Sequence, residues 1–354
     1  MAVTAKHGIC TYLSPRSPPT VVGPTTKKAT RPTIQLPRSL INGARVEKKE
    51  VFDPKKHLNF QPPKKVYTMK EIGLEGQGIS PVAASEPFPL FTIDAIKQIR
   101  AEVFSEPVLE NCQYASSFAS NMIRGMGRAR APFTCDAWSS PELLSKISEV
   151  AGVDLVVAFD YEIANINISA DDPASAALHN GDNTLDNEPP AFSWHYDSFP
   201  FVCVTMLSDC TGMIGGETAI KTPSGEIKKI RGPAMGTAVI MQGRYIEHQA
   251  LKALGGRERI SMVTPFRPRS PFIRDELVLT GSRAISNWSE LYTGYTAYRL
   301  ELLKERFRAK LNDEKQRQSG KHRFSISDMV NFLTEQKGFL ETTIAELTEV
   351  EDMD

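Results

Sequence analysis

Residues 193–209 read SWHYDSFPFVCVTMLSD, a short polar motif followed directly by an apolar, strand-like run. His195 and Asp197 stand two positions apart, so an extended backbone would point both side chains to the same face. A third side chain of suitable chemistry is His248, which stands in RYIEHQA after a segment long enough for several short strands. Two histidines and one carboxylate can hold a metal ion and leave three positions open, a set that favours ferrous iron. A zinc site would usually be a closed tetrahedron or keep a single open position.

The sequence around this motif predicts a β-rich core between helical flanks. Short alternating stretches, separated by Gly, Pro and Asp, read DLVVAFDYEIANINIS, FPFVCVTMLSD, ETAIKT, EIKKI, GTAVIMQG and RISMVTPF. Regular turns without intervening helices favour an antiparallel sandwich or barrel. We therefore predict one domain at 66–354, divided into a helical flank (66–153), a β core (154–274) and C-terminal helices (275–354).

Helical periodicity marks the two flanks. Ile96, Ile99 and Val103 recur at helical spacing, and Ser140 before Pro141 predicts the start of another helix, which ends near Gly152. After residue 274 one helical stripe is formed by Trp288, Leu291, Tyr295, Leu303, Phe307 and Leu311, and a last helix is expected from about Ser327. These C-terminal helices could cap the mouth of the core or form a homodimer face, and the sequence leaves both open.

Composition limits the partners and the location of the protein. The 42 Lys and Arg balance the 42 Asp and Glu, so no overall field favours nucleic acid. No apolar run approaches the ~18–20 residues of a membrane span. The five cysteines are scattered without a C-x-x-C pair, which argues against a disulfide framework or a thiolate zinc site. Residues 1–65 are rich in Pro, Lys, Arg and Thr and predict an extended or loosely ordered arm.

The first 46 residues contain no acidic residue, which leaves a mitochondrial presequence open. Six prolines in this stretch oppose the amphipathic helix that such a presequence needs. We therefore expect a cytoplasmic protein.

A second motif follows His248 in GRERISMVTPF. Strand alternation puts Arg259, Ser261 and Val263 on one face and Ile260 and Met262 on the other. A guanidinium binds a carboxylate through a charge-assisted fork, and a neighbouring serine can add another hydrogen bond. The sequence thus predicts a carboxylate-binding pair one strand away from the metal ligands.

H-x-D, a distal His and R-x-S together resemble the iron- and 2-oxoglutarate-dependent dioxygenase superfamily, over roughly Phe159 to Pro268. The resemblance implies a double-stranded β-helix (a jelly roll, cupin-like) with flanking helices. It also implies Fe(II) at His195, Asp197 and His248, with 2-oxoglutarate and O2 as cosubstrates and Arg259 and Ser261 on the far carboxylate. Because Asp197 is present, hydroxylation, desaturation or ring closure is favoured over halogenation.

The segment HYDSFPFVCVTMLSD is also similar to fungal members of secondary metabolism, which include an aziridine-forming enzyme that acts on valine. This narrower likeness implies oxidation of an unactivated C–H bond in a small molecule such as an aliphatic amino acid, with release of succinate and CO2. GGET at 215–218 resembles the turn before a core strand in related hydroxylases, although a plain turn explains it equally well.

Other residues are candidate contacts to the cosubstrate or substrate. In YEIANINIS, alternation puts Tyr161, Asn165 and Asn167 on one face, either toward the cavity or toward solvent. Asn167 and Thr205 are our further candidates for cosubstrate binding, with strand packing as the alternative for Thr205. Arg257 competes with Arg259 for the carboxylate, and Trp194 and Phe199 either shape the pocket or pack in the core.

Three less specific interpretations remain beside the small-molecule oxygenase. His195 and Asp197 could form an ordinary hydrogen-bonded pair, with His248 a satisfied core histidine. The acid-free arm would suit a hydroxylase that acts on a protein or peptide. A cupin-type protein could bind a metal or ligand without turnover, although it would leave the R-x-S motif unexplained.

Overall fold

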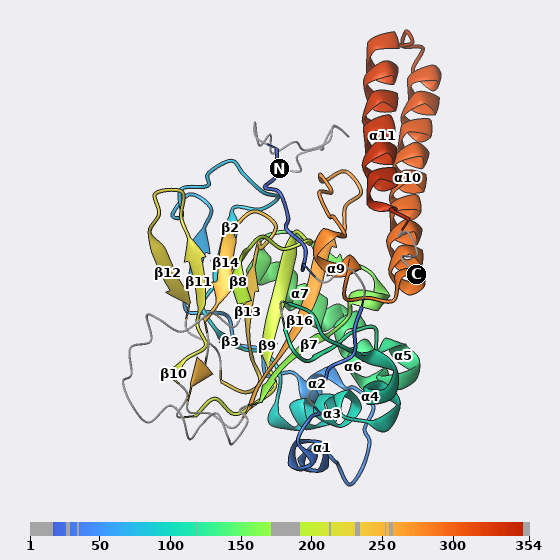
Figure 1. Cartoon of the computed structure of the whole chain (residues 1–354). Coiled ribbons are helices and arrows are strands. Elements are labelled where there is room, and N and C mark those ends of the chain that lie inside the picture. The colour runs from blue at the N-terminus through green and yellow to red at the C-terminus, as the bar shows by residue number, and fades with distance from the viewer. Residues whose placement is uncertain are drawn as a thin grey trace.

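The computed structural model describes residues 17–25, 29–33, 35–117, 119–170, 192–211, 214–230, 234–251, 253–254 and 258–349. Two antiparallel sheets form the centre of the molecule, and helices cover one of them (Figure 1). The larger sheet has the order β1-β2-β13-β9-β16-β7-β5-β4, with β3 beside β13 and β6 beside β16. Its strands are β1 (Val66–Thr68), β2 (Val82–Ser85), β3 (Phe88–Pro89), β4 (Gln113–Tyr114), β5 (Met122–Ile123), β6 (Leu155–Val157), β7 (Asn165–Ala170), β9 (Phe201–Met206), β13 (Thr237–Met241) and β16 (Glu258–Pro268).

The smaller sheet has the order β12-β11-β14-β8 and carries the H-x-D motif at one edge. Its strands are β8 (Phe192–His195), β11 (Thr218–Lys221), β12 (Ile227–Ile230) and β14 (Glu247–Ala250). A separate two-stranded ribbon joins β10 (Ile214–Gly215) to β15 (Ala253–Leu254). The antiparallel β core expected from the alternating stretches is therefore present, with helices around it.

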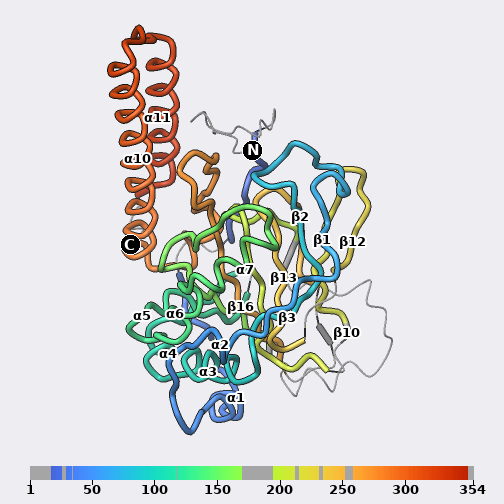
Figure 2. The backbone as a smooth tube through the Cα atoms, turned by 180° about the vertical axis from the view of Figure 1, so that it is seen from behind, coloured from blue at the N-terminus to red at the C-terminus, as the bar shows by residue number. Residues whose placement is uncertain are grey.

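The helices gather in two places. Most lie against the outer face of the larger sheet (Figure 2), whereas the last two form a long hairpin that projects from the body. They are α1 (Arg38–Gly43), α2 (Pro54–His57), α3 (Ile93–Val103), α4 (Glu106–Cys112), α5 (Gly127–Arg130), α6 (Pro132–Ser139), α7 (Pro141–Ala151), the 3-10 turn η1 (Asp160–Glu162), α9 (Thr280–Arg283), α10 (Trp288–Ser319) and α11 (Ile326–Glu346).

The core of the molecule lies between the larger sheet and α3, α6 and α7. Strand alternation sends Ile260, Met262 and Phe266 of β16 to this side, where Phe266 packs edge-on against Trp138 of α6. The helix boundaries follow the expected caps. Ser140 Oγ accepts a hydrogen bond from the Leu143 amide at the start of α7, and the chain leaves that helix through a left-handed residue at 152.

The sheet begins earlier in the chain than the sequence predicted. Strands β1 to β5 lie within residues 66–123, inside the expected helical flank, so the boundary at 154 is corrected. These strands are two to four residues long, too short to display an alternating pattern. The described part of the N-terminal arm contains α1 and α2 and contributes the buried side chains of Leu40 and His57. It is therefore packed on the domain at these points.

Within the described residues, no helix is both long and apolar enough to cross a membrane.

Candidate metal centre and its cavity

The three predicted metal ligands come together at the edge of the smaller sheet. β8 and β14 are antiparallel neighbours, and their register sets His195 directly opposite His248. Asp197 follows β8 by two residues, and its backbone amide donates to the Gly243 carbonyl at 3.0 Å. The turn after β13 therefore fixes the position of the carboxylate, while strand pairing fixes the two imidazoles.

The geometry of this group suits a single ion. Asp197 Oδ1 lies 3.5 Å from His195 Nε2 and 3.6 Å from His248 Nε2. The two imidazole ring centres are 4.3 Å apart. One ligand atom from each of the three residues falls within 4.8 Å of the others. A metal at ordinary nitrogen and oxygen distances of ~2 Å could thus touch all three.

The polar surroundings also fit a cation. Burial by itself would raise the pKa of the Asp197 carboxyl, but the imidazoles of His248 and His195 outweigh burial and hold that pKa below its usual range. Asp197 Oδ1 faces both imidazoles, whereas Oδ2 is buried beside Gly243 and has no hydrogen-bond partner among the described residues, so the carboxylate keeps acceptor capacity that a cation can use. His248 Nδ1 donates to the Ile246 carbonyl at 2.9 Å, which leaves Nε2 to face the carboxylate.

Gly243 makes room for the Asp197 carboxylate. A β-carbon at position 243 would lie 2.7 Å from Asp197 Cγ and closer still to Oδ2. We expect Gly243→Ala to displace the carboxylate and lower the affinity for Fe(II) or Ni(II) about 10- to 100-fold, the range found when a ligand's support is lost. Anaerobic metal titration measures this loss.

The control for Gly243→Ala is Gly338→Ala in α11, where an added β-carbon meets nothing within 4 Å. This variant should bind metal like the native protein. Unchanged affinity in Gly243→Ala would show that the carboxylate does not depend on this glycine.

A cavity of about 440 Å³ lies between the two sheets, with the three ligands in one wall. The opposite wall is the inner face of the larger sheet and includes Asn167, Arg259, Ser261 and Val263. The predicted alternation of β16 is therefore confirmed, because Ile260 and Met262 lie on the other side, in the core. β7 and β16 pair with Asn167 opposite Ser261, so these two predicted residues are neighbours on the same wall.

Arg259 has the properties of an anion-binding residue. Its Nη1 lies 3.5 Å from Ser261 Oγ, so the two side chains present their donors together. Burial lowers the pKa of the Arg259 guanidinium, yet arginine remains charged in proteins. None of the described carboxylates forms an ion pair with Arg259. A half-buried cation that lines a cavity in this way is stabilised by an anionic ligand.

Two sequence-based placements are corrected by the structure. Thr205 is fully buried but faces away from the cavity, because Val202 and Val204 of the same strand line it. Its hydroxyl lies 3.9 Å from Cys203 Sγ, so the alternative of strand packing describes Thr205. Tyr161 falls in η1 rather than in a strand, and its hydroxyl accepts from the Asn287 amide at 2.8 Å.

Several weaker candidates are also placed. Phe199 lines the cavity, whereas Trp194 is half-buried and stacks under the Lys221 ammonium. Thr218, the last residue of GGET, begins β11 and lines the cavity. Arg257 lies outside the described residues. Arg124 and Glu162 also line the cavity, although no sequence motif marks either residue.

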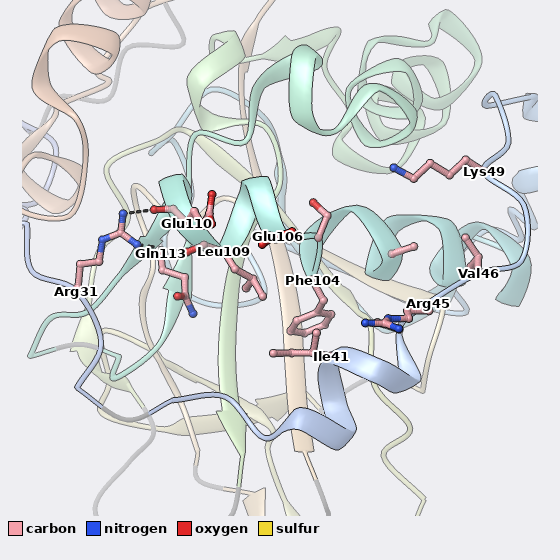
Figure 3. A pocket seen from close by; sticks show the side chains of 13 residues that line it. Arg31, Ile41, Arg45, Val46, Lys49, Phe104, Glu106, Leu109, Glu110 and Gln113 are labelled. Atoms are coloured by element: carbon pink, nitrogen blue, oxygen red, sulfur yellow. Dashed lines mark hydrogen bonds between the residues drawn. The ribbon is translucent and has the colours of Figure 1, made fainter.

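A second hollow of about 780 Å³ lies beside α1, α3 and α4 (Figure 3). Arg31 extends to the end of α4 there and donates to the Leu109 and Glu110 carbonyls. Arg45 and Lys49 supply further positive charge. None of the described residues that line this hollow is a histidine or a cysteine, so it offers no comparable ligand set for a metal.

No model of a known protein family matches the chain, and no curated protein matches it. Solved structures do. An oxidoreductase of the 2OG-Fe(II) oxygenase family from Burkholderia pseudomallei is 14% identical, covering 44% of this chain and 68% of its own, with a TM-score of 0.31. A prolyl-4-hydroxylase from Pseudomonas putida is 17% identical over 50% and 88%, with a TM-score of 0.32. A nickel complex of the non-heme monooxygenase ThoJ is 11% identical over 63% and 96%, with a TM-score of 0.35.

Proposed function

We propose that this protein is an Fe(II)- and 2-oxoglutarate-dependent oxygenase that oxidises an unactivated C–H bond of a small molecule. One observation carries the proposal. His195, Asp197 and His248 converge on one wall of a cavity whose opposite wall holds the half-buried Arg259 beside Ser261. A metal with open positions and a guanidinium for a distant carboxylate together match the two ends of a dicarboxylic keto acid.

Each side chain has a distinct role in this proposal. His195, Asp197 and His248 would hold Fe(II), and the Ile246 carbonyl orients His248. Arg259 and Ser261 would bind the far carboxylate of 2-oxoglutarate, with Asn167 beside Ser261 as a further hydrogen-bonding partner. When bound, iron would supply the redox chemistry with O2 that converts 2-oxoglutarate into succinate and CO2. The protein's part would be to position the reactants and exclude side reactions.

The facing sheets support a finer description of the fold. We infer a double-stranded β-helix, because an eight-strand jelly roll places its ligands between two antiparallel sheets in this way. The apolar lining beside the polar groups suits a small aliphatic substrate such as an amino acid, and Met122, Val202 and Val204 contribute to that lining.

The direct test is turnover by the native protein. Fe(II)-loaded protein, 2-oxoglutarate and O2 are incubated with a panel of amino acids and other small metabolites, and succinate is measured with and without each compound. We expect succinate that requires all three components and rises with a substrate. Absence of both iron binding and 2-oxoglutarate turnover would refute the proposal.

A non-catalytic cupin-type binding protein predicts a different result from the same assay. It would retain metal but form no oxidant-dependent product. The half-buried Arg259 beside Ser261 has no role in that alternative.

The C-terminal hairpin carries an apolar stripe that we infer to be a homodimer interface. On α11 the stripe follows a heptad spacing, with Ile326, Leu333 and Leu340 seven residues apart. Val330 and Ile344 each stand four residues after a member of that series. On α10 it comprises Leu300, Phe307 and Leu311. These eight side chains are 42% to 73% exposed, although the predicted helical stripe is well packed at Leu291 and Tyr295.

The two halves of the stripe lie on the same side of the hairpin. α10 and α11 contact each other through Phe307 and Phe332 and through Arg299, which donates to Thr343 Oγ1. In an antiparallel helix pair, the residue one position after each contact residue points to the same side of the pair on both helices. Such a heptad seam is typical of helices that pair. A standard interface buries about 800 Å² on each partner, and eight exposed apolar side chains spread over two long helices offer a surface of that order.

We expect the native protein to be a dimer at micromolar concentration and the Leu333→Glu/Leu340→Glu variant to be a monomer. Two buried carboxylates would raise the dissociation constant more than 100-fold, because charge at the centre of an apolar interface is costly. Sedimentation analysis measures the mass.

Asn331→Glu adds charge to an exposed position of another face of α11 and should stay dimeric. A native monomer at high concentration would contradict this inference.

A further inference from the structure

Three polar residues line the cavity apart from the metal ligands and Arg259. Arg124 and Asn165 are each 7% exposed and Glu162 is fully buried, and all three belong to the lining of the cavity. Arg124 Nη2 donates to both oxygens of the Glu162 carboxylate, at 2.7 and 2.8 Å. Asn165 Nδ2 donates to Glu162 Oε2 at 2.7 Å. We call Arg124, Glu162 and Asn165 the polar cluster.

Two atoms of the polar cluster have no hydrogen-bond partner among the residues that the structure describes. They are Arg124 Nε, a donor, and Asn165 Oδ1, an acceptor, and both are buried. A buried polar atom without a partner costs about 1–3 kcal/mol, so such atoms are uncommon unless a ligand or water completes them. The cluster thus offers a bound molecule one donor and one acceptor.

The charge of the polar cluster limits what can bind. Arg124 and Glu162 neutralise each other, so the cluster has no net charge. A lone carboxylate would approach the Glu162 carboxylate, and a lone ammonium would approach the Arg124 guanidinium. A group that is neutral overall avoids both repulsions while it pairs with the two free atoms.

We propose that the polar cluster binds a net-neutral substrate group in which a hydrogen-bond acceptor stands beside a donor. An amide and the ammonium-carboxylate head of an amino acid both have this chemistry. The proposal rests on the proposed function, since it assigns the cluster to the substrate of that site. The group's acceptor would receive a hydrogen bond from Arg124 Nε, and its donor would bond to Asn165 Oδ1.

The sheet register separates this subsite from the cosubstrate carboxylate. Asn165 pairs with Val263, whereas Arg259 pairs with Ser169 at the other end of the same two strands. Four residues of strand correspond to about 13 Å. Both ends line the same cavity, so substrate head and cosubstrate carboxylate can be bound together. The apolar side chains of Met122, Val263 and Ile285 also line it and suit an aliphatic remainder.

The test compares four probes that share a branched aliphatic group. Valine is a zwitterion and isovaleramide is a neutral amide, whereas isovalerate is an anion and isobutylamine a cation. Calorimetric titration of the Fe(II)- and 2-oxoglutarate-loaded protein without O2 gives each affinity. We expect at least one neutral probe to bind about tenfold more tightly than both singly charged probes, and which one binds distinguishes amide from amino acid.

Asn165→Ala removes the free acceptor and should weaken binding of the preferred neutral probe about 5- to 10-fold, as expected for one hydrogen bond. Metal and 2-oxoglutarate affinities should not change. The second variant is Glu162→Gln, in which glutamine keeps the shape of glutamate without its charge. It leaves the Arg124 charge unopposed and should shift the preference toward isovalerate.

Equal affinity for all four probes, no binding of any probe, or native affinity in Asn165→Ala would each overturn the proposal. Failure of the proposed function is recognised separately, because it appears as loss of metal and 2-oxoglutarate binding in the native protein. In that case probe selectivity is measured on the protein without metal or 2-oxoglutarate.

Discussion

Asp197→Ala is expected to lower the affinity for Fe(II) at least about 100-fold and to abolish succinate formation. The substitution removes the only carboxylate among the three ligands, including the Oδ1 atom that faces both imidazoles. Loss of residues that merely support a ligand already costs 10- to 100-fold in metal affinity, so loss of a ligand should cost more. Anaerobic titration with Fe(II), followed by metal analysis of the protein, measures the effect.

Asp209→Ala is the matched control for this prediction. Asp209 is exposed, and its carboxylate bonds to the Thr211 amide and hydroxyl. That variant should bind iron and form succinate like the native protein. If Asp197→Ala retained native iron affinity, His195, Asp197 and His248 would be an ordinary hydrogen-bonded group, and the proposed metal centre would be wrong.

The sequence predicted the metal ligands because their geometry follows from local rules. An H-x-D spacing on extended backbone points two side chains to one side, and a strand that returns through a turn can bring a third beside them. The spacing could not predict that β8 and β14 pair with His195 opposite His248, because this contact joins distant parts of the chain. The R-x-S pair was predictable for the same reason, since alternation on β16 is regular.

The sequence failed where the backbone departs from a regular strand or where contacts are distant. Tyr161 was expected to share a face with Asn165, but η1 interrupts the strand and Ala164 adopts a left-handed φ of 59° before β7 begins. Alternation then starts afresh at Asn165. The polar cluster joins residues 38 positions apart in the chain, and no local pattern marks Arg124 as the partner of Glu162.

Thr205 illustrates a different limit. Alternation correctly separates Thr205 from Val204, but it does not say which of the two faces points to the cavity. Both faces of β9 are buried, one against helices and one against the cavity, so hydrophobicity does not distinguish them. The register with β16 decides the question, because Val204 pairs with Val263 on the cavity side.

Arg259→Met is expected to raise the dissociation constant for 2-oxoglutarate about 100-fold or more. Methionine keeps an unbranched, apolar stem of similar shape but removes the guanidinium that lies beside Ser261 Oγ. Removing one partner of a buried, hydrogen-bonded charge pair costs about 2–5 kcal/mol. Arg259→Lys should have a dissociation constant between those of the native protein and Arg259→Met, because an ammonium keeps the charge but lacks the planar fork. Calorimetry on the metal-loaded protein without O2 measures these affinities.

The sharper measurement compares 2-oxoglutarate with 2-oxopentanoate, which has the same chain but no far carboxylate. The native protein should prefer 2-oxoglutarate by the same factor that Arg259→Met loses, and in Arg259→Met the two keto acids should bind alike. Arg269→Met removes an exposed arginine paired with Asp154 and should leave the preference intact. A native preference that survived in Arg259→Met would place the far carboxylate elsewhere, since a guanidinium that binds an anion cannot be replaced by a thioether without loss of selectivity.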